Sequence, residues 1–311
     1  MTTKNELWFF YTLLLVVMIL WGLNVVALKI VVDYMPPATM QALRIFSAGL
    51  VVLGFMIVCK DFKQMKKARP ALGSIVMACL LGVVGHHFFL AVGLQTTTAT
   101  NTSLILALVP LTTAVFAMIF LGDPLTKTRL LGILSGFGGV FLILNAGDGS
   151  LGTLSSGDGF VLLSMAVQAL SFIFIRRATV YIHPRPLTGL MFMGGSAILL
   201  VMSFLLEPGG FAVMFSAPVS VWLVFAGSAI LATAVGHQLY NGAIQRIGAG
   251  EAAIFNNFVP FFGVVSSVIF LNETAYPAQW IGFLFIVLGV LLGTGYIEQK
   301  VLTGRRYNTS T

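Results

Sequence analysis

Ten long apolar segments, joined by short connections, dominate this sequence. The hydrocarbon core of a bilayer needs about 20 mostly apolar residues per helix, and each segment is close to or above that length. Charged residues make up 9% of the chain, against roughly 25% in soluble domains, so water cannot be the solvent for most of its surface. We therefore predict an all-α integral membrane protein whose ten transmembrane helices lie at residues 9–32, 37–59, 72–95, 99–121, 127–145, 157–180, 185–206, 219–243, 248–271 and 277–297.

The basic residues are distributed unequally among the connections. With the N-terminus in the cytoplasm, the even-numbered connections and both tails hold Lys and Arg, whereas the odd-numbered connections hold none. This is the positive-inside pattern, and it predicts a multi-pass protein of the bacterial inner (plasma) membrane with both termini in the cytoplasm. The net charge of +7 then reflects membrane topology, and we expect no nucleic-acid partner. The first apolar run is too long for a cleavable signal and is expected to be a retained span.

The two halves of the chain repeat each other. A shift of 150 residues places His87 on His237 and Pro110 on Pro260 without a gap. Each half has an odd number of predicted spans, so the second half is inverted relative to the first, and such repeats place a binding site near the midplane at the interface of the halves. We expect two inverted five-helix repeats around a central cavity, with the divisions 9–145, 157–297 and a cytoplasmic tail at 298–311.

Polar side chains within the hydrocarbon are costly, which makes each a candidate for function. His87 and His237 fall near the midplane; His86 precedes the first, and Tyr240 and Asn241 follow the second. A neutral imidazole both donates and accepts, so it can hold a zwitterion or take up a proton. The alternative is a buried histidine bonded to a neighbouring helix. We favour a cavity lining, and expect no metal because no carboxylate or cysteine stands at ligand spacing.

Pro110 and Pro260 lie in the middle of matching predicted helices. A proline there frees the carbonyl four residues earlier, which belongs to Leu106 in one half and to Asn256 in the other. In lipid, such a carbonyl must find a partner or face a wet cavity. We predict two hinges that face the cavity, with Asn256 and Asn257 beside the second, against the alternative of static kinks.

The first predicted helix carries Trp21 and Asn24, three residues apart and therefore on one face. Cavity stacking and ordinary packing are equally consistent with Trp21, and the aligned part of the sixth helix offers Gln168. Lys29 and Asp33, four residues apart near the outer end, predict an ion pair at the rim.

Two charged residues are candidates for coupling or for a gate. Arg44 lies about two turns into the second predicted helix, and we slightly favour a structural role in which it bonds carbonyls of neighbouring helices. Glu251 opens the ninth, where a carboxylate favours the helix dipole, and there too a structural role is preferred.

Two glycine patterns have no role in the chemistry. Residues 147–152 spell a dinucleotide fingerprint, which we discard because the motif must follow a strand and open a helix. The pairs Gly132 and Gly136, and Gly289 and Gly293, are small-xxx-small faces that predict close packing of the fifth and tenth helices.

Taken in order along both halves, these residues resemble the drug/metabolite transporter superfamily with two EamA-type repeats. This sequence has Asp123 and Asn272 where a Gly-Glu pair is usual in both halves. The resemblance implies a ten-helix basket with a central cavity that moves small metabolites by alternating access, and many relatives are similar to bacterial amino-acid exporters. The residues that carry it are Trp21-Gly22-x-Asn24, Lys29, Leu43-Arg44-Ile45-Phe46, Pro110, Leu121-Gly122-Asp123, Gly132, Gly139-Val140, Pro260, Leu271-Asn272-Glu273, Gly282 and Gly289.

The leading hypothesis is a secondary transporter that exports a small polar or zwitterionic metabolite, such as an amino acid, with protons as a candidate coupling ion. The alternatives are an intramembrane enzyme, which would need a catalytic constellation that the sequence lacks, and a receptor or scaffold, which would want a soluble domain. A channel would want a charged ring or filter. We expect no cofactor, no enzymatic activity, and a monomer or weak homodimer in the bilayer.

Overall fold

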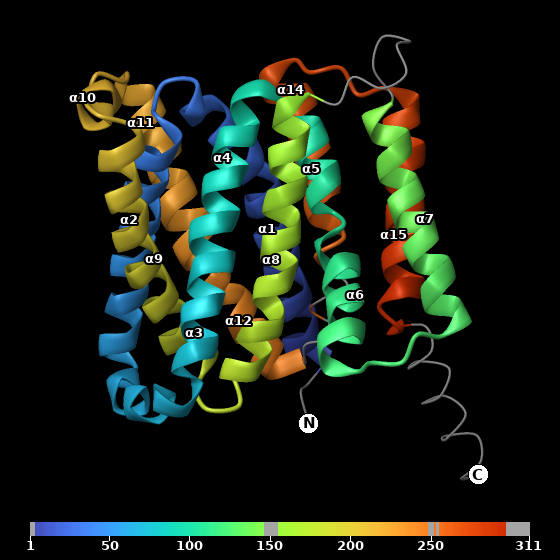
Figure 1. Cartoon of the computed structure of the whole chain (residues 1–311), viewed down its shortest axis with the longest axis horizontal. Coiled ribbons are helices and arrows are strands. Elements are labelled where there is room, and N and C mark those ends of the chain that lie inside the picture. The colour runs from blue at the N-terminus through green and yellow to red at the C-terminus, as the bar shows by residue number, and fades with distance from the viewer. Residues whose placement is uncertain (1–3, 146–154, 248–251, 253–254, 297–311) are drawn as a thin grey trace.

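The computed structural model describes residues 4–145, 155–247, 252 and 255–296 of the chain (Figure 1). Within these residues every regular element is a helix, which confirms the predicted all-α class for this part of the chain. The first half contains α1 (Lys4–Val32), α2 (Pro37–Val58), the 3₁₀-helix η1 (Asp61–Ala71), α3 (Leu72–Cys79), the π-helix η2 (Leu80–Gly85), α4 (His86–Thr96), α5 (Ala99–Leu106), α6 (Val109–Leu121) and α7 (Lys127–Leu144).

The second half follows the same order of long apolar helices. It contains α8 (Ser156–Ala178), α9 (Pro184–Leu206), the short α10 (Gly210–Phe215), α11 (Val219–Ala226), the π-helix η3 (Gly227–Val235), α12 (Gly236–Ile247), α14 (Phe258–Leu271) and α15 (Pro277–Gly293).

Eight helical stretches among the described residues are long and apolar enough to cross a membrane. They coincide with the first eight predicted spans, while the ninth and tenth predicted spans correspond to shorter apolar helices, α14 with 14 residues and α15 with 17. Residues 248–251 and 253–254 of the ninth predicted span lie outside the described residues.

Helix starts follow from local chemistry. Pro37 and Pro277 occupy the first turns of α2 and α15, where the missing N–H costs nothing. Ser155 caps α8 through a capping box with Asp158, whose side chain accepts the Ser155 N–H. Thr98 caps α5 by accepting the Asn101 N–H. These residues fix where α2, α5, α8 and α15 begin.

Two helices of the fold are capped by a glutamate from another helix. The Glu207 carboxylate, directly after α9, accepts the backbone N–H groups of Ala38 and Thr39 at the start of α2, at 2.9 and 2.8 Å. The Glu273 carboxylate, after α14, accepts the same two groups at the start of α5, from Ala99 at 2.8 Å and Thr100 at 2.8 Å. The two joints lie at the end of the bundle opposite the N-terminus of α1 (Figure 1).

The helices of the two halves interlock. The four most extensive helix pairs are α7 with α15, α2 with α9, α1 with α14, and α4 with α8. Each pair joins a helix of residues 9–145 to a helix of residues 157–297. The centre of the molecule is therefore built from both halves.

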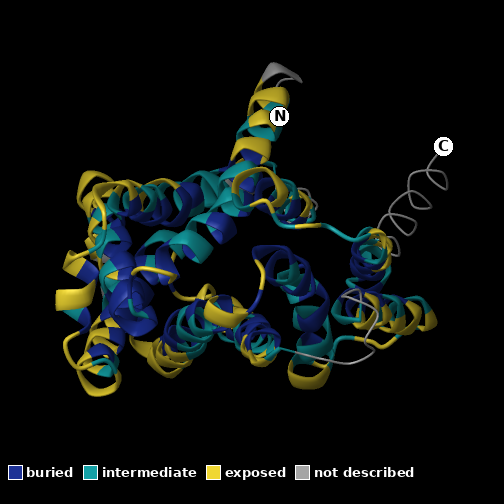
Figure 2. Ribbon diagram, turned by 90° about the horizontal axis from the view of Figure 1, so that it is seen from above, coloured by how far each residue is buried: buried dark blue, intermediate teal, exposed yellow. Residues whose placement is uncertain are grey.

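The exterior of this molecule is apolar, as well as much of its interior, unlike the exterior of a water-soluble protein. Large apolar side chains cover the outside, among them Leu205 at 74% exposure and Leu284 at 66%. Figure 2, which views the bundle from above, shows buried residues on the inward sides of the helices. Polar groups such as Gln41 and Arg44 are instead enclosed, at 0% and 1% exposure. Only an apolar solvent such as lipid favours this arrangement.

Helices α7 and α15 touch through their backbones. A Cβ on Gly289 would lie 2.6 Å from the backbone nitrogen of Gly136, and one on Gly282 would lie 2.6 Å from the carbonyl oxygen of Gly139. No side chain fits between the two helices at these positions. The predicted close packing of these glycine faces is confirmed.

Candidate functional site

Two π-helices place the paired histidines. In the first half η2 ends at Gly85, and α4 begins with His86 and His87. In the second half η3 ends at Val235, and α12 begins with Gly236 and His237, 150 residues further along the chain. π-Helices are rare and occur frequently at functional sites, because the widened turn leaves carbonyls available to other groups. His87 and His237 therefore each follow a π-helix, at equivalent positions of the two halves.

The helices break, rather than bend, before Pro110 and Pro260, the two prolines that match at the 150-residue offset. α5 ends at Leu106 and α6 restarts at Val109, so that Pro110 occupies the first turn of a new helix. In the second half, residues 256–257 form a turn and α14 restarts at Phe258. The carbonyl of Asn256, which the sequence predicts to be freed by Pro260, accepts the Val259 N–H at 3.1 Å and so has found a partner. A tighter i→i+3 turn satisfies the group locally.

Arg44 is the centre of a buried polar network inside the bundle. Its Nε donates to Gln41 Oε1 at 2.8 Å, and its Nη1 donates to Ser228 Oγ at 3.3 Å and to Thr233 Oγ1 at 2.7 Å. Its Nη2 donates to His87 Nδ1 at 3.0 Å, which requires the neutral ring with Nδ1 as acceptor. We call Gln41, Arg44, His87, Ser228 and Thr233 the arginine cluster.

The predicted partners of Arg44 were wrong. The guanidinium bonds side chains from α2, α4 and η3, and none of its bonds goes to a backbone carbonyl. Thr233 can accept from it because its own hydroxyl hydrogen is donated to the Ser228 carbonyl at 2.8 Å within η3. The cluster therefore ties a helix of the second half to two of the first.

A second group of rings lies beside the arginine cluster. The Trp21 ring centroid is 5.1 Å from that of His237 and 5.1 Å from that of Tyr240, and Phe192 meets His237 edge-on at 5.9 Å. Tyr240 accepts an N–H from the Asn256 amide at 2.9 Å. We call Trp21, Phe192, His237 and Tyr240 the aromatic cluster.

The π-helix η3 joins the two clusters. Trp21 Nε1 donates to the carbonyl of Ala232 at 2.9 Å, and His237 Nδ1 donates to the carbonyl of Thr233 at 2.7 Å. The Thr233 hydroxyl meanwhile accepts from Arg44. A rearrangement of this one turn would move both the cation and the rings.

The remaining predicted site residues are placed less centrally. The His86 ring centroid lies 4.8 Å from that of His87, but its Nδ1 lies 2.9 Å from Ser164 Oγ on α8. The Gln168 Oε1 atom is buried without a hydrogen-bond partner. Asn241 lies on α12 and Asn257 precedes α14. Neither Gln168 nor Asn241 bonds a member of the two clusters.

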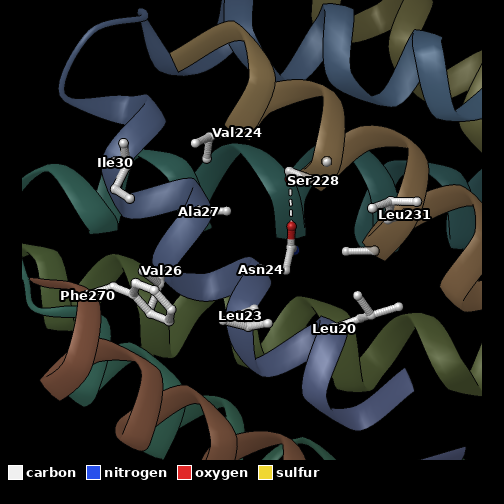
Figure 3. Close-up of a pocket in the computed structure, with 12 residues that line it drawn as sticks. Leu20, Leu23, Asn24, Val26, Ala27, Ile30, Val224, Ser228, Leu231 and Phe270 are labelled. Atoms are coloured by element: carbon white, nitrogen blue, oxygen red, sulfur yellow. Dashed lines mark hydrogen bonds between the residues drawn. The ribbon is translucent and has the colours of Figure 1, made fainter. Parts of the chain in front are cut away.

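A cavity of about 260 Å³ opens beside the arginine cluster (Figure 3). Its walls are apolar side chains of α1, α11, η3 and α14, and its polar members are Asn24 and Ser228. Ser228 Oγ donates to Asn24 Oδ1 at 2.6 Å, as the dashed line in Figure 3 marks. Of the residues predicted to line a cavity, Asn24 is the one that borders this space.

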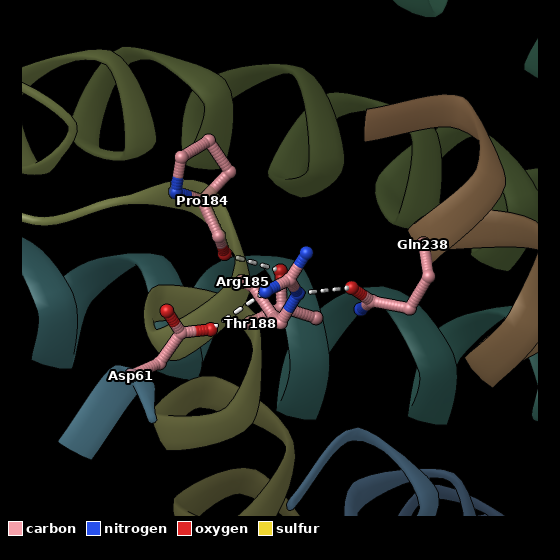
Figure 4. A network of polar contacts seen from close by, with 5 residues as sticks. All are labelled: Asp61, Pro184, Arg185, Thr188 and Gln238. Atoms are coloured by element: carbon pink, nitrogen blue, oxygen red, sulfur yellow. Dashed lines mark hydrogen bonds and ion pairs between the residues drawn. The ribbon is translucent and has the colours of Figure 1, made fainter. Parts of the chain in front are cut away.

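A polar network also crosses the end of the bundle nearest the α8–α9 turn. Arg185 Nη1 lies 2.8 Å from Asp61 Oδ2, and Arg185 Nε donates to Gln238 Oε1 at 3.2 Å. Figure 4 shows the Arg185 side chain between these two partners, which come from η1 and α12. This ion pair holds three elements together at the bundle end.

The predicted rim ion pair of Lys29 and Asp33 is not formed. Lys29 Nζ donates to the carbonyl of Leu94 at 2.6 Å and makes no ion pair with Asp33, whose side chain is exposed. A buried carbonyl of α4 is a nearer acceptor than a carboxylate that water already solvates. Glu251 and the glycine-rich stretch 147–152 lie outside the described residues.

Sequence reasoning missed Gln41, Ser228, Thr233 and Phe192. Each is an ordinary residue in an apolar helix, with no repeat partner of matching chemistry at the 150-residue offset. The available signal was the pair Ser228 and Thr233, two hydroxyls within one apolar run opposite a buried arginine.

An all-helical bundle with a largely apolar exterior and an enclosed polar cluster has the architecture of a polytopic membrane protein. The sequence profile of the EamA-like transporter family matches residues 8–145 and again residues 155–294. The chain belongs to the EamA-like transporter family, and the protein is a multi-pass membrane transporter of the drug/metabolite transporter type.

Relatives of this family come from bacteria and plants. The chain is 31% identical to "Uncharacterized transporter YyaM" of Bacillus subtilis (strain 168), over 96% of both chains. It is 25% identical to "WAT1-related protein At3g02690, chloroplastic" of Arabidopsis thaliana, over 91% of this chain and 68% of the other. It is also 23% identical to "Uncharacterized inner membrane transporter YedA" of Escherichia coli (strain K12), over 89% and 87%.

One solved crystal structure has the same fold. It superposes with a TM-score of 0.66 at 19% sequence identity and covers 93% of this chain and 97% of its own. At that identity the likeness concerns the fold alone.

Proposed function

We propose that this protein is a secondary transporter that exports a small polar or zwitterionic metabolite, such as an amino acid or a related compound, by alternating access. The observation that carries the proposal is the arginine cluster, in which α2 and α4 of one half meet η3 of the other. A charge within the membrane is retained where it faces a substrate or ion pathway. A polar cluster at the interface of repeated halves supports such a pathway.

The cavity beside the cluster supports a small substrate. Its volume of about 260 Å³ is below the roughly 300–1,000 Å³ typical of drug-sized pockets. Its apolar walls with two polar residues at one side favour a metabolite with a polar head and a short apolar body. Apolar amino acids have this form.

The paired irregularities support alternating access. Each half has a π-helix ahead of its histidine and a helix break ahead of its proline, at equivalent positions. Discontinuous helices in corresponding places of two halves are the usual position of a transport site. The proposal includes ten spans as two inverted repeats, with both termini in the cytoplasm of a bacterium, and a monomer or weak homodimer that is sufficient for transport.

Metabolite profiling tests this function. Bacteria that overproduce the protein are compared with bacteria that overproduce the His87→Ala variant at equal membrane levels, and medium and cytoplasm are both measured. Export predicts that a set of small metabolites accumulates outside only with the intact protein. If no compound changes in either compartment, and if liposomes containing the protein move none with or without a pH gradient, the function is wrong.

A further inference from the structure

Arg44 is a buried cation that no acidic residue neutralises within the described part of the chain. Its side chain is 1% exposed, and its four hydrogen bonds go to neutral groups of Gln41, His87, Ser228 and Thr233. A buried guanidinium is normally paired with a carboxylate, because the removal of a charge from water is otherwise costly. Here the protein surrounds the guanidinium of Arg44 with neutral hydrogen-bonding groups only.

The acidic residues near helix ends are already committed elsewhere. Glu207 caps α2 and Glu273 caps α5. The Asp158 carboxylate accepts from Ser155 in the capping box of α8, and Asp61 pairs with Arg185. Arg185, by contrast, is neutralised by a carboxylate, since its Nη1 lies 2.8 Å from an oxygen of Asp61. Arg185 therefore has a carboxylate partner, whereas Arg44, in the arginine cluster, has none among the described residues.

Two donors of the arginine cluster are left over. A guanidinium has five N–H groups, and the four bonds of Arg44 leave one N–H of Nη2. Beside it, the Nε2 amide of Gln41 is buried, at 0% exposure of the residue, and has no hydrogen-bond partner. Buried donors without an acceptor are rare, and two of them side by side are explained if a ligand supplies the acceptor.

The Ser228 hydroxyl stands between the guanidinium and the cavity. It is the longest of the Arg44 contacts, at 3.3 Å, and it also donates to Asn24 at 2.6 Å on the cavity wall (Figure 3). An anion that entered past Asn24 would take the place of this weak contact at Nη1 and would also accept from the free N–H of Nη2. Two parallel N–H···O bonds of this kind are the preferred geometry between arginine and a carboxylate.

We propose that Arg44 is the binding point for a carboxylate of the transported substrate, so that the protein carries carboxylate-bearing metabolites and rejects the same skeletons without that group. This proposal rests on the transport function above. One guanidinium matches one negative charge, and a small, mostly apolar cavity fits a monocarboxylate, with or without an amino group, better than a phosphate dianion. Ser228 and Gln41 position the arginine when the site is empty.

The test compares matched compounds. The full-length protein is reconstituted in liposomes loaded with a bacterial metabolite extract and with matched sets on single skeletons: leucine, leucinamide, 3-methylbutylamine and 4-methylpentanoate, and the same four forms of alanine, valine and phenylalanine. Efflux of each compound is followed by mass spectrometry. We expect every transported compound to carry a carboxylate, and the amide and amine of a transported skeleton to leave at least tenfold more slowly.

Variants separate binding from folding. Arg44→Gln is expected to abolish efflux of the acids, and Arg44→Lys, which keeps the charge but loses the planar fork, to reduce it at least tenfold without changing the preference for acids. Arg177→Gln, which removes an exposed arginine at the end of α8, is the matched control and retains efflux. If Arg44→Gln does not fold, the comparison of acids with amides and amines in the intact protein still decides.

The outcomes are distinct. Equal efflux of acid and amide, or retained acid efflux in a folded Arg44→Gln variant, would overturn the carboxylate site and leave the transport function standing. No efflux of any compound from the intact protein would overturn the transport function itself.

Discussion

Glu207 holds Thr39 through two hydrogen bonds at once: its Oε2 accepts from the Thr39 backbone N–H at 2.8 Å and from the Thr39 hydroxyl at 2.7 Å. Glu273 holds Thr100 in the same manner, at 2.8 and 2.6 Å. A serine of the glutamate's own helix approaches each threonine at 2.6 Å, Ser203 in one joint and Ser267 in the other. The same joint is therefore built twice, between different pairs of helices.

Removal of either glutamate is expected to destabilise the protein. An N-terminal cap contributes about 0.5–2 kcal/mol, and both helix starts also lose a bonded threonine hydroxyl. Glu207→Ala and Glu273→Ala should each lower the unfolding midpoint in detergent, and the double variant should show the sum, because the joints share no residue. Asp33→Ala, at an exposed carboxylate nearby, is the control. Midpoints no lower than that control would contradict this role.

The backbone contact of α7 and α15 predicts that the same substitution has different effects on stability at the adjacent residues Gly138 and Gly139. A Cβ on Gly139 would lie 2.5 Å from the Gly282 carbonyl oxygen, whereas one on Gly138 would meet nothing within 4 Å. Gly139→Val should cost about 1–3 kcal/mol more than Gly138→Val, since both make the same change in helix propensity. Thermal unfolding and size-exclusion profiles measure it. Equal losses in both variants would show that the two helices do not touch there.

The indole N–H of Trp21 is expected to matter for transport apart from its ring. Trp21→Phe keeps most of the aromatic surface but loses the bond to the Ala232 carbonyl, which corresponds to about 1 kcal/mol or roughly fivefold in rate. Trp222→Phe, in the peripheral ring stack with Phe215, is the control. Initial efflux rates from proteoliposomes give the comparison. A Trp21→Phe protein as fast as the control would remove this bond from the mechanism.

Cysteine labelling tests the orientation. In a background of Cys59→Ser and Cys79→Ser, which removes both native thiols, Ser216→Cys lies after α10 and Tyr181→Cys lies between α8 and α9, both at exposed positions. A membrane-impermeant maleimide added to intact cells should label the former only, and should label both after permeabilisation. The opposite pattern would invert the topology, and labelling of both in intact cells would contradict the proposed number of spans.

The first eight spans and their approximate boundaries were accessible from sequence because apolar length and helix-start chemistry are local properties. The repeat was accessible too, and its offset correctly aligned the two π-helices that precede His87 and His237. Pairings such as α2 with α9 were not accessible, because they depend on how glycine faces and caps fit together in space.

The sequence identified several of the residues that form the two clusters, but not the contacts between them. A π-helix inserts an extra residue into a turn, which rotates everything after it by about 100°. For this reason the faces of Gln238, Tyr240 and Asn241 could not be assigned by helical spacing after η3. Arg44 was found, but its partners Ser228 and Thr233 lie 184 and 189 residues away.

That separation has a consequence for how the protein is made. Chains are synthesised at about 5–20 residues per second, so roughly 10–40 s pass between the synthesis of Arg44 and that of its hydroxyl partners. During this time α2 is in the membrane, or waiting to enter it, with a guanidinium whose lasting acceptors on η3 do not yet exist. The interlocking of the two halves makes insertion of the early helices a provisional step, which only the arrival of the late ones completes.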